Sequence, residues 1–455
     1  MALIKTSQRT PLALAMAALL LSGCAGFSQD GGLDAVSAAT QARTGQAVRL
    51  SGATDQAQLD ELLRQPLSAD AAVRVALINN RGLKAALADL GASEADLVQA
   101  GRLRNPGLSF GRLHGGGENE IERGITFDLA GLLTLPWRSG IERGRFEQAK
   151  LQAASQAVQL AADTRRAYFN AVAARQSAEF MERAGAAAEA GAELAGRMAR
   201  AGNWSKLDQT REQAFYADAM AQSARARHQA TASREHLTRL LGLWGERAAF
   251  TLPERLPDLP DAPTEVADLE AQAMTQRLDV LISKHETAAQ ARALGLSRAT
   301  GFINVLDAGY ANKSSSGAPR QNGYQVTLEL PIFDWGGARN AKARALYMQA
   351  VERTADTAVR ARSDVREAYS AYRTSYDLAR HYRDQVVPLR KKISDEVLLR
   401  YNGMLSGVFE LLADAREQIG SVNAAIDTQR DFWIAQTELQ SAINGNGGPS
   451  AKEQP

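Results

Sequence analysis

Residues 125–129 read Ile-Thr-Phe-Asp-Leu, and residues 326–330 read Val-Thr-Leu-Glu-Leu, 201 positions later. Around each motif, apolar and polar residues alternate over about nine residues, at 121–129 and at 324–332. Such alternation places apolar side chains on one face of a strand, and a membrane-spanning β-strand needs about nine to eleven residues. The two motifs therefore predict two strands that each have one apolar face.

Each of these strands has a weaker partner just before it, at 107–114 and at 302–311, which predicts two hairpins. A soluble sheet with one hydrated face is the alternative reading. If the strands enter a membrane, four are too few to close a barrel, because open edges are not tolerated in lipid and the smallest bacterial barrels have about eight strands. Several chains must then contribute strands, and three chains would give twelve.

Two further motif pairs recur at the same spacing, so the chain is predicted to be an internal duplication. They are Ala167-Tyr168 with Ala368-Tyr369, and Gly202-x-x-Ser205 with Gly403-x-x-Ser406. We expect one structural repeat at 69–252 and a second at 264–443. The connector between them, 253–263, holds four of the 13 prolines and is predicted to be stiff.

Each repeat is predicted to contain a helix, two strands, a long helix, a break and a returning helix. The expected helices are 69–104, 138–200 and 205–242 in the first repeat, and 264–300, 337–400 and 406–443 in the second. Both long helices have inward positions at alternating steps of three and four, which is coiled-coil spacing. In the second they are Val351, Ala355, Ala358, Arg362, Val365, Tyr369, Tyr372, Tyr376 and Ala379, and in the first Ala154, Ala157, Ala161, Thr164, Tyr168, Ala171, Arg175 and Ala178. These patterns predict closely packed helices about 95 Å long in a tubular body.

The N-terminus has the features of an export signal. Basic residues precede the apolar run 11–21, which ends in Leu21-Ser-Gly-Cys24. This ending resembles a bacterial lipobox, which implies cleavage after residue 23, acylation of Cys24 and stable anchoring by lipid. Ala25, in place of Asp, favours the outer membrane. The alternative is an ordinary signal peptide with a chance cysteine. We expect residues 24–68 to form an irregular, lipidated lead-in and residues 444–455 a disordered tail.

Composition excludes several functions. Without the two basic residues of the signal, the chain has 51 basic and 51 acidic side chains, so it has no electrostatic attraction to nucleic acid. One cysteine excludes a disulfide framework, and the five histidines show no metal-ligand spacing except the loose pair His228 and His236, eight residues apart, which is more typical of a solvated helix face. The lipase-like motifs at 107–111 and 114–117 stand in the wrong order for a catalytic site. The sequence therefore predicts neither an enzyme nor a metal or cofactor, apart from the lipid at Cys24.

Residues 331–337, Pro-Ile-Phe-Asp-Trp-Gly-Gly, and residues 401–415, Tyr-Asn-Gly-Met-Leu-Ser-Gly-Val-Phe-Glu-Leu-Leu-Ala-Asp-Ala, resemble the TolC-type outer-membrane efflux factors in their lipoprotein branch. The likeness covers essentially the whole mature chain. It implies a mostly α-helical homotrimer in which long antiparallel helices form a periplasmic α-barrel and four strands per chain build a twelve-stranded outer-membrane barrel. It also implies docking, through a periplasmic adaptor, to an inner-membrane transporter.

The two helix breaks are the candidate contact sites. Gly202 and Gly403 are expected to stop the long helices, and Ser205 and Ser406 to cap the returning ones. In the resembling family these tips face the adaptor, so the four residues become candidate adaptor contacts. Plain capping is the alternative role.

The candidate gate is acidic. We expect Asp208 and Glu410 about two turns into the returning helices, where acidic residues of the resembling family line the closed periplasmic entrance. Rings of carboxylates in a narrow pore favour cations. The family has a further acid at the position of Ala413, whereas the nearest acid here is Asp414, rotated by about 100° around the helix. Solvated helical carboxylates are the alternative for all three.

Two functions from different classes remain. One is a passive exit duct in the outer membrane, and the other is a periplasmic coiled-coil lipoprotein that braces the envelope. The strands distinguish them, because a brace needs no apolar strand faces. The sequence does not identify the transported substrate.

Overall fold

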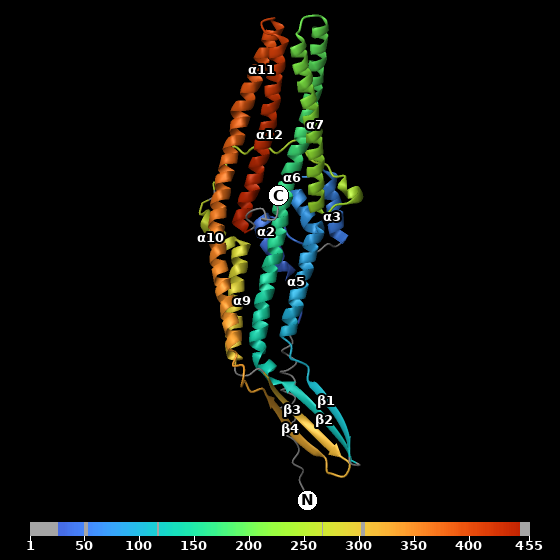
Figure 1. Cartoon of the computed structure of the whole chain (residues 1–455), viewed down its shortest axis with the longest axis vertical. Helices are drawn as coiled ribbons and strands as arrows, with labels where there is room; N and C mark the ends of the chain where they lie inside the picture. Colours follow the sequence, from blue (N-terminus) through green and yellow to red (C-terminus); the bar gives the residue numbers. More distant parts are fainter. Residues whose placement is uncertain (1–25, 50–52, 116–117, 266, 302–304, 446–455) are drawn as a thin grey trace. The chain divides into compact units, whose positions relative to one another are not determined.

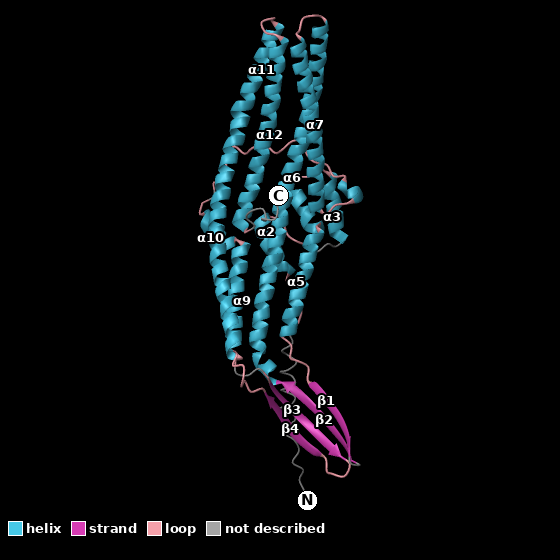
Figure 2. Ribbon diagram, in the orientation of Figure 1, coloured by secondary structure: helices cyan, strands magenta, loops and turns pink. Residues whose placement is uncertain are grey.

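The computed structural model describes residues 26–49, 53–115, 118–265, 267–301 and 305–445. The signal peptide, Cys24 and the tail beyond 445 therefore lie outside the described residues. The chain is mostly helical with a small sheet (Figures 1 and 2). It divides into two compact units, and each unit draws on both predicted repeats. The strand-bearing unit comprises residues 1–35, 87–153 and 281–357, and the helical unit comprises residues 36–86, 154–280 and 358–455.

The strand-bearing unit contains one antiparallel sheet with the strand order β1-β2-β3-β4 (Figure 2). The strands are β1 (Gly107–Gly115), β2 (Glu118–Asp128), β3 (Leu306–Ser315) and β4 (Gln321–Leu328). All four predicted strands are present, and β2 pairs with β3 to join the two hairpins. Strand β4 ends four residues before the predicted boundary at 332, since Pro331 has no N–H to donate to a ladder.

The register separates the sheet into two chemically different faces. Phe127 lies opposite Ala308, and Asp128 lies opposite Asp307. One face, which we call the apolar face, carries Leu108, Phe110, Ile125, Phe127, Tyr310, Tyr324 and Val326, and also Arg112 and Arg123 nearer the hairpin turn of β1 and β2. The other, the polar face, carries Glu120, Glu122, Thr126, Asp128, Asp307 and Lys313. The large side chains of the apolar face are exposed, and Tyr324 is 91% exposed, so none of the residues that the structure describes covers this face.

The order of elements over residues 69–241 returns over residues 269–444. The helices are α2 (Leu33–Thr44), α3 (Ala53–Arg64), α4 (Ala69–Asn79), α5 (Arg81–Ala100), α6 (Leu129–Arg200), α7 (Lys206–Leu241), α8 (Leu269–Gln276), α9 (Leu278–Ala299), α10 (Gly337–His381), α11 (Val387–Asn402) and α12 (Val408–Asn444). The predicted first helix of each repeat is split, because Asn80 and Arg277 adopt extended backbone between two helices. A short 3-10 turn spans Gly245–Ala248, and a π turn at Tyr382–Val386 interrupts the second predicted long helix.

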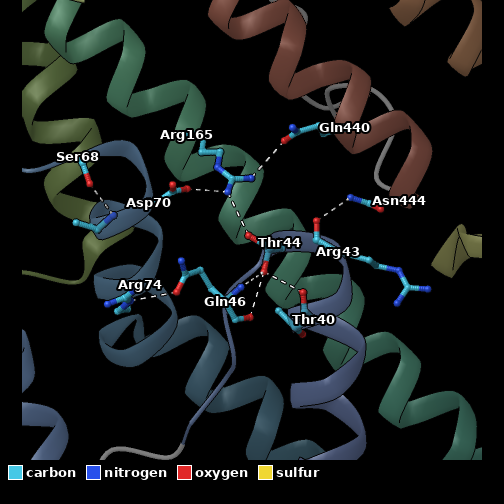
Figure 3. A network of polar contacts seen from close by, with 11 residues as sticks. Thr40, Arg43, Thr44, Gln46, Ser68, Asp70, Arg74, Arg165, Gln440 and Asn444 are labelled. Carbon is cyan, nitrogen blue, oxygen red and sulfur yellow. Dashed lines mark hydrogen bonds and ion pairs between the residues drawn. The ribbon is translucent and has the colours of Figure 1, made fainter. Parts of the chain in front are cut away.

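The sequence predicts an irregular lead-in at 24–68. This prediction is wrong, because the segment contains the helices α2 and α3. A polar network within the helical unit fixes the end of α2 (Figure 3). Arg165 on α6 donates to the carbonyl oxygen of Thr44 at 3.2 Å and to Asp70 Oδ1 at 3.0 Å. Asn444 donates to the carbonyl oxygen of Arg43 at 3.3 Å. These partners lie far apart in the sequence, so hydrophobic periodicity carries no trace of them.

The core of the helical unit is aromatic. Tyr372 and Tyr376 on α10 pack against Phe432 on α12, with ring centroids 5.6 and 5.7 Å from that of Phe432. The Pro-rich connector packs onto this cluster: Tyr376 Oη donates to the carbonyl oxygen of Asp261 at 2.7 Å, and Trp433 Nε1 donates to that of Pro257 at 3.1 Å. The connector is therefore part of the core as well as a spacer.

The predicted coiled-coil seam holds for the first repeat, where seven of its eight positions are buried and Arg175 is half-buried. In the second repeat Val365, Tyr372, Tyr376 and Ala379 are buried, but Ala355 and Arg362 are exposed. Ala361 is buried in place of Arg362. Burial of a small apolar residue avoids the desolvation of a guanidinium group, and this outweighs strict heptad spacing.

Arg277, between α8 and α9, is the most buried cation of the helical unit that enters an ion pair, with 2% of its surface exposed. Its Nη2 lies 2.8 Å from Asp279 Oδ2 and 3.1 Å from Asp364 Oδ2, and its Nη1 donates to the carbonyl oxygen of Ala442 at 2.8 Å. Burial alone would lower the pKa of Arg277, but the hydrogen bond and charge of Asp279, with those of Asp364, raise it above its ordinary value. The group thus joins α8, α9, α10 and α12 through one charged side chain.

Candidate functional site

The first helix break ends α6 with a left-handed glycine and begins α7 with a serine cap. Gly202 has φ +75°, and Asn203 N–H donates to the carbonyl oxygen of Met198 at 2.9 Å, which is the Schellman pattern. Ser205 Oγ then accepts a hydrogen bond from the N–H of Asp208 at 3.1 Å. Both local roles expected for Gly202 and Ser205 are present.

The second break uses the same backbone motif one residue later. Gly403 has φ −80°, whereas Met404 has φ +58° and occupies the left-handed position. Leu405 N–H closes the motif by donating to the carbonyl oxygen of Arg400 at 2.8 Å. The residue before α12 is Gly407, and no side chain caps this helix, so the expected capping role of Ser406 is wrong. Within the described part of the chain, Ser406 Oγ is buried without a hydrogen-bond partner.

Met404 is a functional candidate that sequence reasoning missed. A left-handed conformation costs a residue with a side chain about 1–2 kcal/mol, and glycine is the usual solution. Here the strained residue also has an apolar side chain that is 94% exposed, with Leu405 exposed beside it. At the first break Leu207 is exposed as well. Strain and exposed apolar surface together are typical of a contact region.

The acidic residues lie closer to the helix starts than expected. Asp208 and Glu410 are each the third residue of their helix, in the first turn rather than two turns in. Asp208 accepts a hydrogen bond from Ser205 Oγ at 2.7 Å, and its Oδ1 lies 3.4 Å from Arg211 Nη1. Glu410 is exposed. A carboxylate in the first turn interacts favourably with the positive end of the helix dipole. Both residues therefore stabilise their helices locally.

A second acid follows one turn later in each helix, at Glu212 and Asp414. The spacing between equivalent residues is 202 here, as between Gly202 and Met404, although both breaks contain five residues, 201–205 and 403–407. Glu212 is 1% exposed and forms an ion pair with Arg416, whose guanidinium lies 4.4 Å from the ring centre of Phe215. Asp414 is also buried, so it is not a solvated carboxylate.

Within the described residues, two buried carboxylate oxygens of these acids, Glu212 Oε2 and Asp414 Oδ2, have no hydrogen-bond partner. Unpaired buried oxygens are costly. Sequence reasoning missed Glu212 and Arg416, and a search at a spacing of 202 beyond the break would have found the acidic pair.

The described residues contain no group of three or more histidine, cysteine or acidic side chains placed to hold a metal ion. None of the helices described has a segment long and apolar enough to cross a membrane.

Comparison with known proteins gives a match of fold but not of sequence. No protein-family model matches the chain, and no curated protein matches it. The CmeC outer-membrane channel of Campylobacter jejuni superposes with a TM-score of 0.73 at 16% identity, over 83% of this chain and 86% of that one.

A membrane protein from Pseudomonas aeruginosa has a TM-score of 0.71 at 21% identity, over 85% of this chain and 92% of that one. The MtrE outer-membrane channel of Neisseria gonorrhoeae, in its open state, has a TM-score of 0.69 at 18% identity, over 82% and 88% of the two chains. The chain therefore has the fold of these outer-membrane channels.

Proposed function

We propose that this chain, which has the fold of the TolC-type outer-membrane efflux channels, is the exit duct of a tripartite efflux or type I export system. In this role it conducts substrates passively from a periplasmic adaptor and an inner-membrane pump to the exterior and catalyses no reaction. The observation that carries the proposal is the sheet, which has one exposed apolar face and one charged face. A wall between lipid and water needs these two faces.

The sheet also supports a trimer. Among the described strands β1 and β4 lie at the edges, and each is paired there on one side only. Open edges are not tolerated in lipid, so neighbouring copies must pair with them. Three copies give twelve strands, with the apolar face toward lipid and the polar face toward the lumen, and the long helices then continue as a periplasmic α-barrel.

A periplasmic structural lipoprotein is the alternative from another class. Such a brace gains nothing from an uncovered apolar sheet face, because exposed apolar patches of this kind promote aggregation in water. The exposure of Phe110, Tyr324 and Val326 therefore favours the duct.

The purified protein in detergent is expected to be a trimer and to produce stepwise conductance in planar bilayers. Phe110→Arg with Val326→Arg should abolish insertion, because each arginine placed on the lipid face costs about 2–4 kcal/mol at the bilayer midplane. Thr327→Arg, on the polar face and opposite Asp307, is the control and should insert normally. A wild-type protein that carbonate washing releases from membranes as a monomer would disprove the duct and favour the brace.

We propose that Asp208 and Glu410 line the periplasmic gate, with the buried side chain of Asp414 behind them. Their equivalent placement at the two helix starts and the exposure of Glu410 support this, while Asp208 is half-buried. In a trimer they supply six carboxylates. A carboxylate about 4 Å from an ion changes its energy by about 1 kcal/mol even in water, so several of them alter cation preference by roughly fivefold or more.

In planar bilayers, Asp208→Asn with Glu410→Gln is expected to lower the permeability ratio of potassium to chloride. Asparagine and glutamine keep hydrogen-bond acceptors, so helix capping survives. Asp218→Asn, an exposed acid further along α7, is the control and should leave the ratio unchanged. Unaltered selectivity in the double variant would remove both residues from the gate.

We also propose the two breaks as the adaptor-contact tips, with Gly202, Ser205, Gly403 and Ser406 at their centres. The uncovered apolar side chains of Leu207, Met404 and Leu405 support this role, since a water-exposed tip has no other use for them. Ser406 contributes through backbone position, because its hydroxyl is buried.

A further inference from the structure

A cavity of about 350 Å³ lies in the strand-bearing unit, where the sheet meets the first turns of α6 and α10. Its lining includes three arginines and two aspartates, which are Arg104, Arg138, Arg339, Asp128 and Asp307. Both aspartates belong to the polar face of the sheet. None of these residues lies at the tips, so the proposed gate and adaptor contacts do not use the cavity.

The two carboxylates stand directly opposite each other in the β2–β3 register. Like charges in this position destabilise a sheet unless cations lie nearby. Asp128 is already engaged: its Oδ1 accepts from the N–H of Gly131 at 2.6 Å, and its Oδ2 lies 3.6 Å from Arg104 Nη1. The three arginines thus line the same cavity as the two opposed aspartates.

The arginines outnumber the aspartates, so the cavity keeps an excess of one positive charge. Arg138 is half-exposed and, within the described residues, enters no hydrogen bond or ion pair. A guanidinium group presents a planar fork of N–H donors that matches the oxygens of phosphate or carboxylate. The volume falls in the range of small-ligand pockets, about 300–1,000 Å³.

We propose that this cavity binds an oxyanion group, phosphate or carboxylate, of a solute that moves along the polar face of the sheet. The proposal rests on the duct function. Three copies in the trimer would form a basic collar where the helices meet the sheet, with a charge opposite to that of the acidic tips. A solute with an anionic group would thus leave a cation-favouring entrance and be held briefly before it enters the barrel.

The test uses the purified full-length trimer and pyrophosphate as the probe. Calorimetry measures its binding, and bilayer recordings measure its block of potassium chloride current. Arg138→Gln with Arg339→Gln should weaken both binding and block at least tenfold. Arg112→Gln with Arg320→Gln removes the same charge from the same unit outside the cavity, and this control should behave as wild type. Arg138→Lys, in place of Arg138→Gln, should recover only part of the affinity for pyrophosphate. Lysine restores the positive charge but not the planar fork of N–H donors.

Equal binding by wild type and the Arg138/Arg339 variant, equal loss in the control variant, or no binding by wild type would each overturn the proposal. Circular dichroism and trimer abundance exclude misfolding as the cause of a loss. Failure of the anion site and failure of the duct function can be told apart. A protein that binds pyrophosphate through these arginines but never conducts would disprove the duct function and leave the anion site in place.

Discussion

Replacing Arg277 by methionine is expected to lower the free energy of unfolding of the helical unit by about 3 kcal/mol. The substitution leaves Asp279 and Asp364 facing each other without a cation and removes the donor to the carbonyl oxygen of Ala442. Breaking a buried ion pair costs about 3–5 kcal/mol, and the lower value applies because both aspartates are partly exposed and water can solvate them. Urea unfolding followed by circular dichroism measures the change.

Arg366→Met is the matched control for this experiment. Arg366 also forms an ion pair, with Glu270 at 2.9 Å, but both side chains are largely exposed. Its loss should cost less than about 1 kcal/mol. Adding Asp279→Asn and Asp364→Asn to Arg277→Met should restore part of the stability, because the repulsion disappears. Equal effects of the two arginine substitutions would show that burial does not strengthen the Arg277 cluster.

Replacing Cys24 by serine is expected to abolish incorporation of labelled palmitate completely. Serine has no thiol to receive the acyl group, and the chain has only one cysteine. We propose that the lipid anchors the chain in the outer membrane, where a single acyl chain gives only marginal binding and several give stable anchoring. The variant should therefore reach the outer-membrane fraction less efficiently, while its strands still permit insertion.

Ala25→Asp separates labelling from sorting. This variant keeps Cys24 and should take up label fully, but shift toward the inner membrane, because aspartate after the lipidated cysteine favours retention there in the resembling class. Wild-type protein without label would contradict the lipobox and leave an ordinary signal peptide.

The strands and the order of helices were predictable because they depend on local periodicity. The alternation around Ile125 and Val326 already separates the apolar face from the polar face, and the small seam of α6 around Ala161 follows coiled-coil spacing. Prediction of the fold therefore succeeds where the polarity of each residue indicates whether that residue is buried.

Contacts between distant residues were not predictable in the same way. Helix α2 of the lead-in is held by Arg165 and Asn444, more than 100 and 400 positions away from their partners. At the tips, the spacing of 202 places Met404 rather than Gly403 in the left-handed position, and Ser406 does not cap α12. The buried pair of Glu212 and Arg416 spans 204 positions and leaves no periodic trace.

The π turn at Tyr382–Val386 has an evolutionary consequence. It accommodates one residue more than an α-helical turn, so every residue beyond it is rotated by about 100° relative to an uninterrupted helix. The helix face that packs into the aromatic core around Tyr376 and the face of α11 that is buried at Val397 are therefore not tied to one continuous α-helical repeat. Insertions or substitutions beyond the π turn can change the break around Met404 without altering the packing of the aromatic core. A single helical scaffold can in this way diversify its tips.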